Sequence, residues 1–264
     1  MALTKLQFSP GVNKEGTDYT ADQGWFDSDK IRFRQGRPEK IGGWEKFSSN
    51  SFLGVSRSLH RWASLAFTKY IGIGTHLKVY IAEGTGFNDI TPIRLTTSAG
   101  DATFSATDGS SILTIAETGH GAVVNDFVTF SGAASLGGNI IATVINQEYQ
   151  INSVINANSY TVIAKDTSAN TVTANSSDSG NGGSSIVATY QINTGLNTYV
   201  SSTGFGVGTW GAGAWGSASD ISSADQLRLY SQDNFGEDLI FNVRGGGIYY
   251  HDTSLGLGSR AIDI

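Results

Sequence analysis

The sequence predicts an all-β protein made of antiparallel sheets, and three observations support this prediction. Short segments along the chain alternate apolar and polar residues, which is the period of a half-buried strand. The 264 residues include 34 glycines and only 3 prolines, a composition that suits many turns. No segment of ten residues or more has the apolar period of an amphipathic helix. Because Val, Ile, Phe, Tyr and Trp occur throughout, a disordered chain is a poor alternative.

The first strands are expected before residue 95. Residues 1–24 show no period and are expected to be irregular. Residues 31–34 alternate apolar side chains with arginines, so they predict a strand, and residues 35–38 are expected to end it as a turn. Further extended segments are expected at 41–47, 54–62, 67–74, 77–82 and 87–91. Short strands at this spacing predict a β-meander, the arrangement of a propeller blade or of one sheet of a sandwich.

The composition changes between residues 95 and 190. Aromatic residues become fewer, and Lys165 is the only basic residue. Strands are expected at 112–115, 127–130, 148–154 and 160–164. The stretch 165–185 is rich in Thr, Ser, Asn and Gly, which predicts a loose loop or a flexible hairpin. We interpret residues 95–190 as a small β-barrel or sandwich that is inserted into a propeller-like body.

The first pattern returns after the insert, with strands expected at 188–193, 226–231, 238–242 and 247–251. The predicted organisation is therefore an N-terminal part of the propeller-like body at 1–94, the inserted module at 95–190, and the continuation of the body at 191–264. The residues outside the insert suffice for about four blades at most, at roughly 40–50 residues each. The expected propeller is thus incomplete: either the chain is the front part of a longer protein, or another subunit completes the sheets.

The net charge of −6 is distributed unevenly along the chain. It is +4 over residues 1–94, −6 over 95–192 and −4 over 193–264. Solvated surfaces explain this distribution, and so does a basic N-terminal part that docks on an acidic partner. The absence of cysteine excludes disulfides and thiolate metal sites. No apolar run approaches the ~18 residues of a membrane helix, so no membrane segment is expected.

Residues 204–216 form the most unusual segment, GFGVGTWGAGAWG. Its glycines allow close approach of the backbone to another surface, and its two tryptophans supply large apolar area with one polar group each. No catalytic or cofactor motif has this composition. We therefore expect a contact between subunits here, made by Trp210 and Trp215.

Residues that carry chemistry show no strong constellation. The four histidines, His60, His76, His120 and His251, lack the spacing of metal ligands. Asp27 with Asp29 and Glu237 with Asp238 are the closest carboxylate pairs, for which turn capping and ion pairing are simpler roles than catalysis. Gly72-Ile73-Gly74 lacks the third glycine of a nucleotide-binding loop. The sequence predicts no catalytic residue, metal or cofactor, and hence no enzyme, although a polysaccharide depolymerase that uses one carboxylate pair is kept as an alternative.

Arg32, Arg34 and Arg37 make the segment around the first strand basic, and aromatic residues lie between them. Proteins that bind single-stranded nucleic acid combine these residue types. Most of the chain is acidic, however, whereas nucleic-acid-binding domains are usually basic overall. We therefore expect these arginines to dock on carboxylates of a partner protein.

Two parts of the chain together resemble a known family. The first comprises residues 11–19, GVNKEGTDY, and 24–44, GWFDSDKIRFRQGRPEKIGGW; the second comprises residues 227–242, LRLYSQDNFGEDLIFN, and 246–250, GGIYY. They resemble structural proteins of tailed bacteriophages, namely the nozzle or hub proteins of short tails. Residues 125–132, 146–151 and 157–162 are similar to a small barrel module of phage tail proteins.

The resemblance implies a structural role in the virion. A protein of this type is expected to form a homo-oligomeric ring, with six copies most expected, that lines the conduit for DNA ejection. It implies tail adaptor and tail fibre proteins as partners, transient passage of DNA, and assembly in the host cytoplasm. The alternative is a tail appendage that binds a receptor or carbohydrate.

Overall fold

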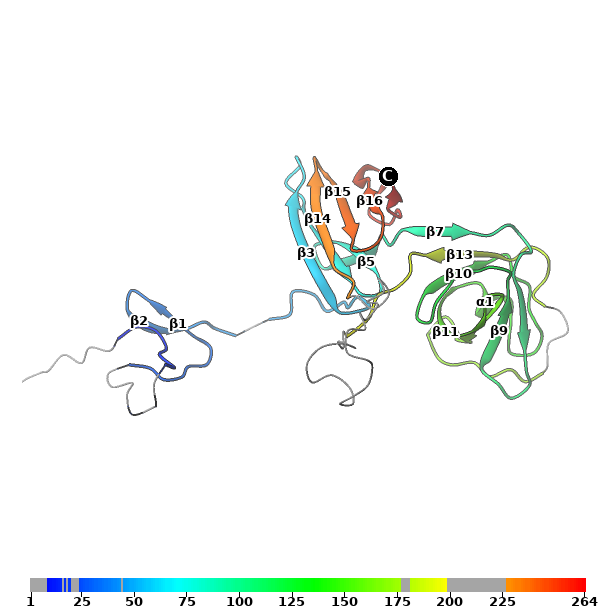
Figure 1. Ribbon diagram of the computed structural model, residues 1–264, viewed down its shortest axis with the longest axis horizontal. Helices are drawn as coiled ribbons and strands as arrows, with labels where there is room; N and C mark the ends of the chain where they lie inside the picture. Colours follow the sequence, from blue (N-terminus) through cyan, green and yellow to red (C-terminus); the bar gives the residue numbers. More distant parts are fainter. Residues whose placement is uncertain are drawn as a thin grey trace, which may run out of the picture. The chain divides into compact units, whose positions relative to one another are not determined.

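The computed structural model describes residues 9–15, 17, 19, 24–43, 45–176, 181–198 and 227–264. The chain divides into two compact units, Met1–Ser49 and Asn50–Ile264. Four antiparallel sheets contain nearly all regular structure of the described residues (Figure 1), which confirms the all-β prediction. In this part of the chain, no helix combines the length and the apolar character needed to cross a bilayer.

A single hairpin is the regular structure of the first unit's described residues. Strands β1 (Ile31–Arg34) and β2 (Arg37–Lys40) pair antiparallel, and Gln35 and Gly36 connect them. These two residues have φ values of 48° and 76°. Two successive positive φ angles are characteristic of the tight turn that suits the twist of hairpin strands.

The sequence prediction was wrong about the second half of this hairpin. It assigned residues 35–38 to a turn and 41–47 to a strand, whereas pairing resumes at Arg37 and ends at Lys40. The physical reason is that a turn of two residues, Gln35 and Gly36, is enough to reverse the chain, so Arg37 already pairs with Arg34. The described residues of 41–47 belong to no strand.

The second unit contains two four-stranded meanders, each with its strands in chain order. The first consists of β3 (Ser56–Ala63), β4 (Lys69–Thr75), β5 (Val79–Glu83) and β6 (Gly86–Asp89). The second consists of β14 (Tyr230–Phe235), β15 (Asp238–Val243), β16 (Ile248–His251) and β17 (Ile262–Asp263). A short 3-10 turn, η3 (Thr253–Leu255), precedes β17. The predicted meanders on either side of the insert are therefore present in the structure, whereas their membership of a propeller stays a prediction.

The two meanders share one hydrophobic core. Buried side chains of both sheets form it: Trp62, Val79, Ile81, Ile90, Leu239, Phe241 and Val243. On β4, a Cβ added to Gly72 would lie 3.1 Å from Cδ2 of Leu239. Glycine on this strand thus lets the second sheet approach closely, and the Gly72-Ile73-Gly74 motif belongs to sheet packing.

A seven-stranded sheet lies between the two meanders in the sequence. It is formed by β7 (Ile93–Thr96), β8 (Thr103–Ala106), β9 (Ile112–Ala116), β10 (Phe127–Ser131), β11 (Glu148–Asn156), β12 (Ser159–Ile163) and β13 (Val187–Gln191). The strand order is β7-β13-β10-β11-β12-β9-β8, and the short helix α1 (Ala142–Ile145) follows β10 in the chain. The sheet curls around its own core of buried residues (Figure 1). Since β7 and β8 stand at opposite ends of the order, the sheet is not a closed barrel, which corrects that form of the prediction.

Several boundaries differ from the prediction. Strand β14 covers Tyr230–Phe235, whereas a strand was expected at 226–231. The short strands β7, β8 and β17 were not expected. Within 165–185, the described residues contain one isolated bridge between Lys165 and Thr171, in a loose segment as predicted. The domain boundaries at 94/95 and 190/191 stay predictions.

Candidate interaction sites

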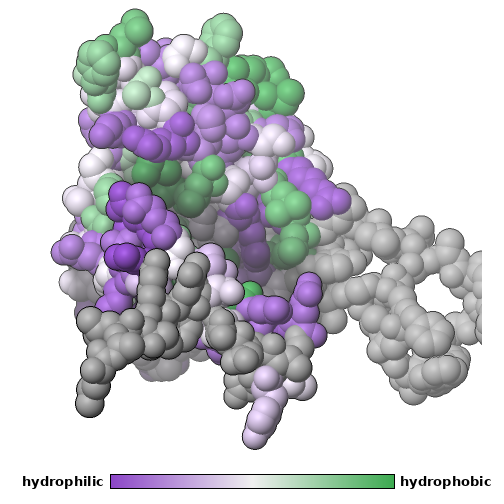
Figure 2. Space-filling view, turned by 90° about the vertical axis from the view of Figure 1, so that its left-hand side faces the viewer, coloured by the Kyte–Doolittle hydropathy of each residue, from purple (hydrophilic) through white to green (hydrophobic). Residues whose placement is uncertain are grey.

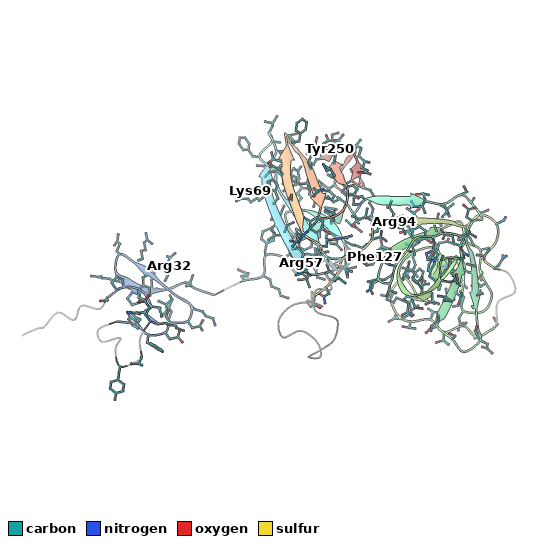
Figure 3. The ribbon with its side chains drawn as sticks, in the orientation of Figure 1. Arg32, Arg57, Lys69, Arg94, Phe127 and Tyr250 are labelled. Atoms are coloured by element: carbon teal, nitrogen blue, oxygen red, sulfur yellow. The ribbon has the colours of Figure 1, made fainter. Side chains whose placement is uncertain are left out.

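The predicted basic residues lie together on the hairpin of the first unit. Alternation along β1 places Arg32 and Arg34 on one face, and the register places Arg37 opposite Arg34. All three side chains are exposed (Arg32 is labelled in Figure 3). The opposite face of β1 carries Phe33, whose ring centroid lies 6.2 Å from that of Trp25.

One of the three arginines is paired within the hairpin. Nε of Arg32 lies 3.1 Å from Oε2 of Glu39 on the facing strand. Arg34 and Arg37 form no ion pair with a described carboxylate. The hairpin thus presents two uncompensated guanidinium groups next to each other, which is a suitable arrangement for binding carboxylates. Trp210 and Trp215, the other predicted contact residues, lie outside the described residues.

The four histidines occupy separate structural positions. His60 stacks on Trp62 with ring centroids 5.6 Å apart. His76 accepts a hydrogen bond at Nδ1 from the backbone N–H of Val55, over 2.9 Å. Burial, with a smaller contribution from nearby arginines, lowers the pKa of His76, and burial also lowers the pKa of the fully buried His251. Among the described residues, no cluster of His, Asp and Glu has the composition of a metal site.

The two candidate carboxylate pairs have structural contacts. Asp27 lies 3.1 Å from Nζ of Lys14 and accepts a hydrogen bond from the backbone N–H of Ser28. The Glu237 carboxylate accepts a hydrogen bond from the backbone N–H of Leu65. Asp238 accepts hydrogen bonds from the Tyr250 hydroxyl and from Thr253, at 2.8 Å for the backbone N–H. Burial opposes ionisation of Asp238, yet these bonds outweigh it and lower its pKa.

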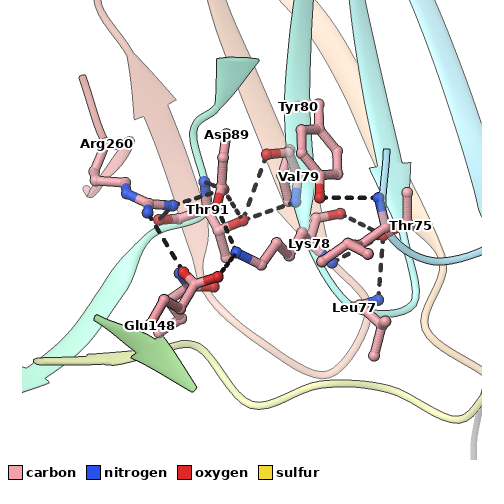
Figure 4. A network of polar contacts seen from close by, with 11 residues as sticks. Thr75, Leu77, Lys78, Val79, Tyr80, Asp89, Thr91, Glu148 and Arg260 are labelled. Atoms are coloured by element: carbon pink, nitrogen blue, oxygen red, sulfur yellow. Dashed lines mark hydrogen bonds and ion pairs between the residues drawn. The ribbon is translucent and has the colours of Figure 1, made fainter. Parts of the chain in front are cut away.

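A network of ion pairs with a buried lysine and three partly buried partners connects the meanders with the seven-stranded sheet (Figure 4). Nζ of Lys78 lies 2.7 Å from Asp89 and 2.5 Å from Glu148. Nη1 of Arg260 lies 2.6 Å from Asp89. The Lys78 side chain is only 4% exposed, and its Nζ also lies 4.4 Å from the centroid of the Phe127 ring. We call Lys78, Asp89, Glu148 and Arg260 the polar joint.

Each member of the polar joint comes from a different part of the fold. Lys78 precedes β5, Asp89 ends β6, Glu148 begins β11 and Arg260 precedes β17. Burial would raise the pKa of Asp89, but Lys78, Thr91 and Arg260 together lower it. Two cations thus balance two carboxylates, so the network is suited to fixing three sheets together and offers no surplus charge to a ligand.

A second buried network lies inside the seven-stranded sheet. The hydroxyl of Tyr190 donates a hydrogen bond to the carboxylate of Glu117, and the hydroxyls of Tyr160 and Tyr190 lie 2.6 Å apart. The His120 ring contacts Tyr160 edge to face, with centroids 4.8 Å apart. Burial raises the pKa of Glu117, although the Tyr190 hydroxyl opposes this shift. The four residues of this network are buried, so it belongs to the core of the sheet.

A cleft of about 870 Å³ opens between the seven-stranded sheet and the sheet β14–β17. Its charged and aromatic lining residues are His76, Arg94, Arg228, Arg244 and Tyr249. No Asp or Glu is among the described residues that line it. Arg94 lies far from the other two arginines in the sequence, and no local motif marks any of the three, so sequence reasoning did not find this site.

Comparison with known proteins adds one distant similarity. No protein-family model matches the chain, and no curated protein matches it. Among solved structures, the chain is similar to the phage phi92 endosialidase, with 16% identity and a TM-score of 0.27. The aligned region covers 78% of this chain and 30% of that protein, so the chain spans less than a third of its length. At this TM-score, the similarity carries no argument about fold or function.

Proposed function

We propose that this chain is a structural component of a bacteriophage tail, of the nozzle or hub type. In this proposal, copies of the chain form a closed ring, with six copies most expected, that surrounds part of the DNA-ejection conduit in the virion. The support is the sequence resemblance of residues 11–19 with 24–44 and of residues 227–242 with 246–250, together with the place of the second pair of segments in the fold. That pair contains β14 and most of β15 and β16.

The outer face of the sheet β14–β17 is the observation that carries the proposal. Leu239 and Phe241 point into the shared core, so their strand neighbours face away from it. The outer face leaves large apolar side chains exposed: Phe235 (67%), Ile248 (47%), Ile262 (60%) and Ile264 (69%). Apolar surface that is gathered in this way is typical of a protein–protein contact. In the proposed ring, a neighbouring copy covers this face.

The ends of two hairpins add a second apolar surface. Leu65 and Phe67, in the β3–β4 turn, are 90% and 86% exposed. The β14–β15 turn is held against this turn by Glu237, whose backbone oxygen accepts a hydrogen bond from Nε1 of Trp62 over 2.7 Å. Phe235 lies on the same β14–β15 hairpin, and Figure 2 shows hydrophobic residues at this upper end of the unit. These side chains suit contact with a further copy or with another tail protein.

The remaining parts have proposed partners of their own. The arginines of the β1–β2 hairpin dock on carboxylates of a tail adaptor or of a neighbouring copy. The seven-stranded module serves as a platform for fibre proteins. No chemical reaction is required of the chain in this role, and DNA passes the ring without being bound tightly.

The copy number of the purified full-length chain tests this proposal. Native mass spectrometry is expected to detect a closed ring, and six copies would match the nozzle or hub type. The variant Ile262→Lys is expected to lose the ring while it keeps the circular dichroism spectrum, and so is the double variant Trp210→Ala/Trp215→Ala. Ile112→Lys, an exposed isoleucine of the seven-stranded module, is the matched control and keeps the ring. A monomer at all concentrations overturns the proposal, and three copies would instead favour a receptor-binding appendage.

A further inference from the structure

The cleft between the seven-stranded sheet and the sheet β14–β17 collects positive charge that no described carboxylate pairs. Arg94, Arg228 and Arg244 line it, and Arg57 reaches its edge by donating a hydrogen bond to the backbone oxygen of Asn197. None of the four forms an ion pair with a described Asp or Glu. This contrasts with the polar joint, where every charge has a partner.

Arg228 is the most constrained of these arginines. Its residue is only 9% exposed, and its Nη1 is buried without a hydrogen-bond partner among the described residues. A Cβ on Gly195 would overlap the Arg228 side chain, so the linker after β13 presses directly on it. A buried guanidinium group with an unused donor is costly unless an anion satisfies it. We take the charge of Arg228, which lies in the cleft wall and forms no ion pair with a described carboxylate, as the first sign of a ligand.

Arg94 gives an independent second sign from the other side of the cleft (Figure 3). Its guanidinium lies over the Tyr190 ring at 4.9 Å, and Nη2 donates to the backbone oxygen of His120 over 3.2 Å. Its Nε is buried and has no described partner. These contacts fix the plane of the group, which prepares it for recognition of a planar oxyanion such as a carboxylate.

His76 adds a neutral donor to the same wall. Because its Nδ1 accepts the Val55 N–H, the neutral ring carries its proton on Nε2. Burial, followed by the charges of Arg57 and Arg228, keeps the pKa of His76 low. Two carboxylates contact residues of this wall or its neighbours: Asp126 accepts hydrogen bonds from Asn193 and Thr194, and Glu117 accepts one from Tyr190. Glu117 also interacts electrostatically with Arg94, without an ion pair between them.

The uncharged lining residues indicate what the uncharged part of the ligand is. Four residues with side-chain amides line the cleft: Asn125, Gln150, Asn193 and Asn197. Two of these amides donate hydrogen bonds within the protein, Gln150 to the backbone oxygen of Asn125 and Asn193 to Asp126, and keep their oxygens as acceptors. An amide offers both a donor and an acceptor, which matches a hydroxyl group. Tyr249, Val124 and Leu196 provide apolar surface beside them. A volume of about 870 Å³ lies within the range of small-molecule sites and exceeds the needs of a lone inorganic anion.

We propose that this cleft binds an acidic carbohydrate, whose carboxylate lies among Arg94, Arg228 and Arg244 and whose hydroxyls contact the amide side chains. The inference does not rest on the proposed ring, because every residue that lines the cleft belongs to one copy of the chain.

Calorimetric titration of the full-length chain tests the proposal with four probes. Tri-galacturonate and a hyaluronan tetrasaccharide are the acidic sugars, maltotriose is the neutral control, and inorganic phosphate is the bare anion. At least one acidic sugar is expected to bind, and its Kd is expected to rise with the salt concentration. The Kd values for maltotriose and phosphate are expected to be at least tenfold higher. The proposal is overturned if neither acidic sugar binds, or if maltotriose or phosphate binds equally well.

Matched variants locate the site. Arg244 is exposed in the β15–β16 turn, so Arg244→Gln is expected to fold normally and to weaken the acidic sugar about tenfold. Arg94→Gln is expected to act in the same direction. Arg61→Gln removes an exposed arginine of β3 that does not line the cleft, and it is expected to leave Kd unchanged. Equal effects of Arg244→Gln and Arg61→Gln would place binding elsewhere and overturn the assignment.

Discussion

The ring of Tyr230 occupies the space that a side chain at residue 74 would need. A Cβ added to Gly74 would overlap this ring, and the Tyr230 hydroxyl donates a hydrogen bond to the backbone oxygen of Thr75 over 2.5 Å. Residues that are 156 positions apart in the chain thus fix how the first strand of the second meander lies on β4. The contact explains why glycine is placed in the middle of a strand, where it otherwise weakens the sheet.

The substitution Gly74→Ala is therefore expected to destabilise the second unit. The added methyl group forces the Tyr230 ring away from β4, and overpacking of this kind costs about 1–3 kcal/mol. Urea unfolding followed by tryptophan fluorescence measures the loss. Gly86→Ala is the control, because the nearest atom to its added Cβ lies 3.6 Å away. Equal unfolding midpoints for the two variants would contradict the packing role of Gly74.

Loss of the central cation of the polar joint is expected to have a larger effect. Lys78→Met removes the closest positive charge of the partly buried Glu148 and leaves the partly buried Asp89 with Arg260 as its remaining ion-pair partner. Breaking a buried ion pair by removing one partner costs about 3–5 kcal/mol. Lys69→Met, at an exposed position of β4, is the control and is expected to change the free energy of unfolding little. An unchanged urea midpoint for Lys78→Met would show that the joint does not contribute to stability.

Local alternation was sufficient to predict two strands of the second meander, β15 and β16, because alternate residues of both strands are buried. The segments expected at 238–242 and 247–251 match β15 and β16 to within one residue at each end. Strand β7 was not predicted from the sequence, because it is a strand through its pairing with β13, which lies about ninety residues away. The curl of the seven-stranded sheet could not be predicted for the same reason, because it depends on which distant strands pair and no local pattern encodes that pairing.

Of the two candidate sites, the hairpin site could be predicted from local sequence and the cleft could not. The hairpin arginines are close in sequence, so alternation along residues 31–34 is enough to predict that Arg32 and Arg34 lie on one face of the strand. Among the cleft arginines, Arg228 and Arg244 are brought together by the β14–β15 hairpin, whereas Arg94 is far away in the sequence and meets them only through tertiary folding. A sequence pattern shows the spacing of residues along one strand or helix. A cleft between two sheets is lined by residues of several elements, so its residues have no regular spacing in the sequence.

Glu117 is expected to give the seven-stranded module a stability that falls as the pH rises. Its pKa in the folded state lies above the ordinary value of 4.5, so the folded state binds more protons than the unfolded state in the window above pH 4.5. Stability is then fully present below pH 4.5 and declines as the pH rises through the raised pKa. Glu117→Gln keeps an acceptor for Tyr190 and removes the charge.

Urea unfolding of both forms between pH 4.5 and pH 8 checks this expectation. The variant is expected to lose this decline and to be at least as stable as the natural chain at pH 8. The lowered pKa values of Asp89 and Asp238 act in the opposite direction, but only below about pH 4, because these groups are already ionised in the tested window. An identical pH dependence of the two proteins would show that Glu117 does not control it.

Reversal of charge on the β1–β2 hairpin is expected to disrupt docking without unfolding the chain. Arg34 and Arg37 are exposed and unpaired among the described residues, so Arg34→Glu/Arg37→Glu removes no internal ion pair. A carboxylate partner would meet two negative charges in place of two positive ones, and like-charge contact costs several kcal/mol at an interface. Incorporation of the chain into tail particles, followed by sedimentation, is expected to fall at least tenfold. The control Arg61→Glu/Lys69→Glu changes the net charge by the same amount, on β3 and β4, and is expected to be incorporated normally. If the hairpin variant is also incorporated normally, docking through Arg34 and Arg37 is refuted.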